Sequence, residues 1–204
     1  PHRNQQRDEM HTIQRQAEQL GMANLDAIPP PNVDWLRAPI QKFGLARDYV
    51  LLIPGGSPLR LEKRWPAEYF SRLAQKLSDD GYTPVLIGTQ AEKNANHWIS
   101  QHCEAAIDLT GRTSLPELAA LCRRASVVIG NDTGPMHIAA AAGCRALVLF
   151  SCYSNPKLCG PQAPKATILQ RDHLCDLPVE EVLSEAMILL SNNLWSLQWL
   201  CHFF

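Results

Sequence analysis

From Tyr49 onward, short apolar runs alternate with amphipathic segments, and this alternation limits the possible folds more than any other feature. The first run, Tyr49-Val50-Leu51-Leu52-Ile53, is wholly apolar, which is typical of a strand buried on both faces of a parallel sheet. Further strands are predicted at 83–87, 105–109, 126–129, 146–150 and 166–169. Helices are predicted at 66–77, 92–101, 136–142 and 179–190, with another beginning at the capping box Ser114-Leu115-Pro116-Glu117. This order predicts an α/β fold with a parallel, doubly wound sheet.

Composition narrows the classes of partner. With 19 basic and 20 acidic residues and a net charge of -1, the chain offers no electrostatic reason to bind nucleic acid or an anionic membrane. Any bound anion must therefore be held by a local arrangement of groups. Seven cysteines without a C-x-x-C pair indicate reduced thiols and a cytoplasmic protein. We expect neither a signal peptide nor a membrane-spanning run.

Three parts follow one another along the chain. Residues 1–48 are predicted to form an exposed helix over 2–21 and then a linker containing Ile28-Pro29-Pro30-Pro31-Asn32, which no helix tolerates. Residues 49–190 carry the sheet, and 191–204 form an apolar tail. That tail either packs on a missing part of the protein or is an aberrant end. A first residue that is Pro rather than Met is compatible with a chain that begins inside a longer protein.

The loop after the first strand has the groups that a phosphate or diphosphate requires. Gly55 and Gly56 leave backbone N–H groups open to a ligand, and Ser57 adds a hydroxyl. Lys63 adds a compact positive charge just before a predicted helix. The loop is neither G-x-G-x-x-G nor a Walker loop, which argues against dinucleotide oxidoreductases and P-loop NTPases. The alternative is a plain turn with solvated basic residues.

A second polar block, Asp132-Thr133-Gly134-Pro135-Met136-His137, follows the strand predicted at 126–129. Thr133 can cap the next helix, and Gly134 lets a ligand approach its free N–H groups. The Asp132 carboxylate can accept hydrogen bonds from sugar hydroxyls, and His137 can donate to an oxygen anion. In the alternative interpretation, Asp132 is only a helix cap and His137 is its partner.

Taken together, these two loops resemble glycosyltransferase family 9, the ADP-heptose:lipopolysaccharide heptosyltransferases, from Tyr49 to about Leu190. The matching segments are Pro54-Gly55-Gly56-Ser57, Lys63-Arg64-Trp65-Pro66, Gly111-Arg112-Thr113-Ser114-Leu115, Glu117-Leu118-Ala119, 131–141 and Gly160-Pro161. The chain departs from the family at Asn155-Pro156, where members often carry Asp-Pro.

The resemblance implies the C-terminal, donor-binding half of a GT-B enzyme, in which two Rossmann-like domains face a cleft. Such an enzyme transfers a sugar from a nucleotide donor, usually ADP-heptose, with inversion and without a metal or other cofactor. The acceptor is lipopolysaccharide core or another glycan, at the inner face of the bacterial inner membrane. The N-terminal domain, which carries the acceptor surface and an Asp base, has no counterpart here, so no catalytic residue can be named. The alternatives are a non-catalytic nucleotide-sugar-binding module and another GT-B enzyme, such as an epimerase or a hexosyltransferase.

The resemblance also suggests roles for individual residues. The positions expected to hold the donor diphosphate are Gly55, Gly56, Ser57, Lys63, Thr133 and Gly134. Those expected to face the donor sugar are Asp132 and His137. Glu92 is a candidate for the acid that binds the ribose, and an exposed surface residue is the alternative for it.

Overall fold

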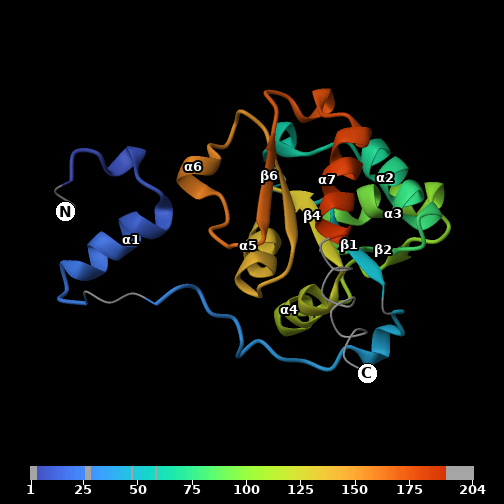
Figure 1. The fold of residues 1–204 in the computed structure, drawn as a ribbon, viewed down its shortest axis with the longest axis horizontal. Helices are drawn as coiled ribbons and strands as arrows, with labels where there is room; N and C mark the ends of the chain where they lie inside the picture. The colour runs from blue at the N-terminus through green and yellow to red at the C-terminus, as the bar shows by residue number, and fades with distance from the viewer. Residues whose placement is uncertain (1–3, 26–28, 47, 58, 192–204) are drawn as a thin grey trace, which may run out of the picture.

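The computed structural model describes residues 4–25, 29–46, 48–57 and 59–191. Within this part, six strands form one sheet in the order β3-β2-β1-β4-β5-β6 (Figure 1). All five pairs are parallel, which confirms the predicted doubly wound α/β sheet. The strands are β1 (Tyr49–Ile53), β2 (Thr83–Leu86), β3 (Ile107–Asp108), β4 (Val127–Asn131), β5 (Ala146–Phe150) and β6 (Ala166–Gln170).

Helices cover both faces of the sheet because side chains alternate between the faces along each strand. The helices are α1 (Thr12–Gly21), α2 (Ala67–Asp79), α3 (Lys93–His102), α4 (Leu115–Arg124), α5 (Gly134–Ala141), α6 (Pro156–Cys159) and α7 (Val179–Ser191). Val50 and Leu52 of β1 pack with α2, α3 and α7. Leu51 and Ile53 point to the opposite face and pack with α4 and α5. The sheet therefore lies between two buried layers, as its wholly apolar strands predicted.

The N-terminal helix begins later than predicted. His11 has extended backbone, and its Nδ1 accepts the Ile13 N–H at 3.2 Å, so α1 starts at Thr12. The other ring nitrogen, Nε2, bonds to the Gly160 carbonyl at 2.9 Å and attaches α1 to α6. Figure 1 shows α1 beside α6 and apart from the sheet. The predicted start at His2 lies outside the described residues.

The segment before β1 is held by α4. The Arg123 guanidinium donates to the carbonyl of Leu36 at 2.7 Å and also to that of Val33. Ile28 of the predicted linker and the apolar tail from 192 onward lie outside the described residues. No helix in the described ranges is long and apolar enough to cross a membrane.

A local sequence signal located the start of α4 correctly. The Ser114 hydroxyl accepts the Glu117 N–H at 3.5 Å, while the Glu117 carboxylate accepts the Ser114 N–H at 2.8 Å, which confirms the predicted capping box. The strand predicted at 105–109 is shorter, because the Asp108 side chain accepts the Thr110 N–H at 2.8 Å and turns the chain. The small helix α6 was not predicted.

Candidate functional site

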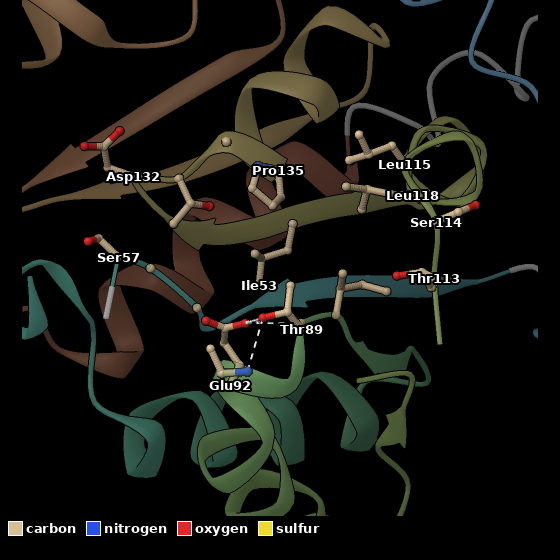
Figure 2. Close-up of a pocket in the computed structure, with 17 residues that line it drawn as sticks. Ile53, Ser57, Thr89, Glu92, Thr113, Ser114, Leu115, Leu118, Asp132 and Pro135 are labelled. Carbon is tan, nitrogen blue, oxygen red and sulfur yellow. Dashed lines mark hydrogen bonds between the residues drawn. The ribbon is translucent and has the colours of Figure 1, made fainter. Parts of the chain in front are cut away.

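A cavity of about 770 Å³ opens at the carboxyl ends of β1, β2 and β4. The chain runs from β1 to β2 on one side and returns to β4 on the other side of β1, so the strand order reverses between β1 and β4. Such a reversal leaves a crevice between the outgoing loops, and ligands of open parallel sheets bind there. Figure 2 shows that Asp132 and Ser57 lie at one end of the cavity, and that Leu115 and Leu118 lie at the other.

Asn131 holds the glycine loop against the rest of the site. This residue is fully buried, and its Oδ1 accepts the Trp65 N–H at 2.9 Å. Its Nδ2 donates to the carbonyls of Pro54 at 2.7 Å and Gly55 at 3.2 Å. The next carbonyl, that of Gly56, accepts from Arg64 at 2.7 Å. Protein groups therefore hold three successive carbonyls of the loop, and Gly55, Gly56 and Ser57 line the cavity.

Helix α5 begins at the polar end of the cavity, where Thr133 and Gly134 line the wall. The predicted side-chain cap is wrong: Thr133 occupies the N-cap position, but its hydroxyl makes no cap bond. The Met136 N–H bonds instead to the Thr133 carbonyl at 3.0 Å. Among the described residues, the buried Thr133 Oγ1 has no hydrogen-bond partner. Buried hydroxyls rarely stay unpaired in native proteins, which makes this atom unusual among the residues at the start of α5.

Asp132, Lys63 and Ser154 form a polar cluster beside this end. Lys63 Nζ lies 3.3 Å from Asp132 Oδ2, and the Ser154 hydroxyl donates to the same oxygen at 2.6 Å. Lys63 also donates to Ser154. Asp132 is therefore an ion-pair partner and not the cap of α5, so the capping alternative is wrong. Asp132 lines the cavity. Lys63 does not line it and is connected to it only by its ion pair with Asp132.

Glu92 lies in the middle of the cavity wall and is only 8% exposed, so the surface alternative is wrong. Its Oε2 accepts from both the backbone N–H and the hydroxyl of Thr89, at 2.8 and 2.7 Å (Figure 2). The side chain also lies against the glycine loop, because a Cβ added to Gly55 would meet Glu92 Cγ at 2.7 Å. Glycine at position 55 therefore makes room for this acid.

The other end of the cavity is apolar, and its residues were not among the predicted site residues. The walls there are formed by Ile53, Ile87, Leu115, Leu118 and Pro135. The available signal was their position, since they end or directly follow strands, or lie in the first turn of helices, at the same edge of the sheet. The neighbouring Ser114 hydroxyl is occupied by Glu117. A flat apolar group of a ligand fits this end better than a charged group.

His137 is not brought to this cavity. The residue lies two positions after Pro135, which rotates it by about 200° around α5. It lines a separate cavity of about 290 Å³ between α5, Ile13 and the Pro30–Pro31 segment. Partial burial lowers the pKa of His137, Asp132 opposes this shift, and His11 adds to it. The lowered pKa favours the neutral ring, which supplies no positive charge for an anion.

Comparisons with known proteins agree with this geometry. The profile of glycosyltransferase family 9 (heptosyltransferase) matches residues 11–186. Lipooligosaccharide heptosyltransferase 2 of Haemophilus influenzae is 34% identical over 113 residues, which is 53% of this chain and 32% of that protein. Lipopolysaccharide heptosyltransferase 2 of Salmonella typhimurium is 29% identical over 153 residues, 64% of this chain and 44% of that protein. The matched regions thus cover less than half the length of these relatives.

Solved structures are similar over a larger share of the chain. The ADP-heptose lipopolysaccharide heptosyltransferase II of Escherichia coli superposes with a TM-score of 0.69 and 28% identity, covering 75% of this chain and 50% of that one. The family 9 glycosyltransferase of Veillonella parvula superposes with a TM-score of 0.79 and 25% identity, covering 94% and 62%. The profile match over most of the chain, together with this fold, shows that the chain belongs to glycosyltransferase family 9.

Proposed function

We propose that this chain is the donor-binding half of a GT-B glycosyltransferase and holds a nucleotide sugar resembling ADP-heptose. The observation that carries the proposal is the start of α5, where Thr133 and Gly134 line the wall of a cavity at the sheet's switch point. A helix N-terminus attracts anions through its free N–H groups and its dipole. A diphosphate placed there would meet these N–H groups.

The cavity suggests one orientation for the donor. The nucleobase would lie among Leu115, Leu118 and the other apolar residues, because a flat ring buries well there. The ribose would pass Glu92, and the diphosphate would meet the Gly55–Ser57 loop and the start of α5. The sugar would then lie beside Asp132, whose carboxylate can accept hydroxyl protons. His137 has no place in this arrangement.

The proposed reaction is an inverting displacement at the anomeric carbon, in which the acceptor oxygen bonds to that carbon and the nucleoside diphosphate leaves. Charge grows on the diphosphate as the bond breaks, and the start of α5 with the loop N–H groups would stabilise it without a metal. The base that takes the acceptor proton, and the surface for a lipopolysaccharide or other glycan acceptor, would come from an N-terminal domain. The described cysteines are free, which fits a cytoplasmic reaction at the inner face of the membrane.

The chain by itself is expected to bind ADP more tightly than adenosine and to transfer no sugar. The diphosphate end of the cavity accounts for the first expectation, and the proposed location of the base accounts for the second. Calorimetric titration with ADP and adenosine tests binding, and product analysis with ADP-heptose and a lipopolysaccharide acceptor tests transfer. Equal affinities would contradict the diphosphate assignment, and multiple turnover would show that the base lies in this chain.

Replacing Gly134 with alanine is expected to weaken ADP binding without loss of stability. A Cβ at this position meets no described atom within 4 Å apart from its chain neighbours and the backbone of its own helix, and Gly134 is not among the glycines with positive φ. Gly134 is the first residue of α5 and precedes Pro135, which disfavours helical backbone at the residue before it, so alanine is expected to change stability little. The added methyl group would instead occupy space at the diphosphate end, and we expect about a tenfold loss of ADP affinity, about 1.4 kcal/mol.

Gly143→Ala is the matched control, at the other end of α5. Gly143 has a φ of 78°, so alanine there should lower stability by about 1–2 kcal/mol. It lines the smaller cavity and not the larger one, so ADP affinity should not change. Calorimetry should show weaker ADP binding only in Gly134→Ala. Thermal melting should show lower stability only in Gly143→Ala. Unchanged ADP affinity in Gly134→Ala would remove the start of α5 from the proposed site.

A further inference from the structure

Three neighbouring strand ends each contribute one member of the polar cluster. Lys63 lies in the loop after β1, Asp132 directly follows β4, and Ser154 lies in the loop after β5. β4 is hydrogen-bonded to both β1 and β5, so the three loops leave the sheet side by side. Lys63 donates to Asp132 and Ser154, and Ser154 donates to Asp132 at 2.6 Å, which closes a triangle.

The triangle uses only one oxygen of the Asp132 carboxylate. Both Lys63 and Ser154 bond to Oδ2, and in the described part of the chain Oδ1 has no hydrogen-bond partner. The χ2 torsion of an aspartate is soft, so the orientation of its carboxylate depends on such partners. The Lys63 contact, at 3.3 Å, is longer than the 2.7–2.9 Å usual for a charge-assisted bond. The shorter Ser154 bond is therefore the one that defines the orientation.

We propose that Ser154 is a positioning residue, which holds the Asp132 carboxylate so that Oδ1 is presented to the hydroxyls of the donor sugar. The inference rests on the proposed function, because it assumes a sugar beside Asp132. Ser154 is only 8% exposed and does not line the cavity, so it acts through Asp132 and not by touching the donor. Its hydroxyl suits this role, because it donates one proton to Asp132 while accepting one from Lys63.

The consequence is a specific change in ligand preference. Without the Ser154 hydroxyl, the carboxylate can rotate and Oδ1 is no longer held toward the sugar. The ratio of ADP-heptose affinity to ADP affinity should then fall, since ADP has no sugar at this position. We expect Ser154→Ala to lower this ratio about tenfold, which corresponds to one hydrogen bond to a charged group.

The experiment is calorimetric titration of the whole chain with ADP-heptose and with ADP, alongside thermal melting. Ser154→Thr keeps the hydroxyl and should preserve the affinity ratio. Ser151→Ala is the matched control in the same loop, because the Ser151 hydroxyl is buried and makes no described hydrogen bond. It should leave the ratio unchanged. If Ser154→Ala does not fold, Ser154→Cys, a weak donor, replaces it under reducing conditions because the Cys159 thiol is a neighbour.

A double-mutant cycle with Asp132→Asn separates positioning from a direct role. If Ser154 acts through Asp132, then Ser154→Ala should change the ratio little in the Asp132→Asn background. Additive losses would overturn the inference, as would an unchanged ratio in a folded Ser154→Ala variant. A wild-type chain that binds ADP but does not prefer ADP-heptose would overturn this inference and leave the nucleotide site standing. A wild-type chain that binds neither ligand would instead contradict the proposed function itself.

Discussion

Replacing Asn131 with alanine is expected to destabilise the protein by about 3–5 kcal/mol, because each buried polar group left unpaired costs about 1–3 kcal/mol. The substitution removes the acceptor of the Trp65 N–H and the donor to the Pro54 and Gly55 carbonyls. Asn131 is 0% exposed, so water cannot easily replace these bonds. A typical domain has about 5–15 kcal/mol of stability, and the loss is therefore a large share.

Urea unfolding of the variant against wild type measures this effect. Asn155→Ala is the control, since Asn155 is exposed and makes one side-chain cap bond, to the Lys157 N–H at 3.0 Å. Loss of that cap should cost about 1 kcal/mol. ADP binding should also weaken in Asn131→Ala at temperatures where the variant is folded, because the loop at Gly55 loses its anchor. Equal destabilisation by Asn131→Ala and Asn155→Ala would contradict the anchoring role of Asn131.

Replacing Lys63 with methionine is expected to weaken ADP binding by about 10- to 100-fold, or about 1.5–3 kcal/mol, and adenosine binding little. In the structure Lys63 does not line the cavity but is paired with Asp132, which does. Without Lys63, an uncompensated carboxylate faces the place proposed for an anionic diphosphate. Repulsion between the two should therefore add to any lost contact. Calorimetry with ADP and adenosine measures both affinities.

The double variant Lys63→Met with Asp132→Asn distinguishes two ways in which Lys63 can act. If Lys63 mainly neutralises Asp132, removing both charges should recover much of the ADP affinity. If its ammonium group binds the diphosphate directly, the double variant should bind ADP no better than Lys63→Met alone. We expect recovery, because the Lys63 ammonium already bonds to Asp132 and Ser154. Equal losses for adenosine and ADP in Lys63→Met would place the diphosphate elsewhere.

Much of the fold and part of the site followed from local patterns. A wholly apolar run such as Tyr49–Ile53 can be satisfied only by burial on both faces, so the sequence alone predicted a parallel sheet covered by helices. Since parallel strands end at one edge, residues that directly follow strands were expected to gather there. Gly55 and Asp132 do line one cavity. The capping box at Ser114 could also be predicted from the sequence, because its two bonds join residues three positions apart.

Contacts between distant segments could not be predicted from local sequence patterns. Ser154 bonds to Lys63, 91 positions earlier, only because the sheet order sets β4 between β1 and β5. An acid such as Glu92 is usually exposed, and only the tertiary structure packs it against the glycine loop. His137 shares a motif with Asp132, but the rotation of α5 turns its side chain to another cavity. Sequence patterns determine which residues a strand or helix must bury, whereas strand order and helix rotation, set by packing of the whole core, decide which side chains meet.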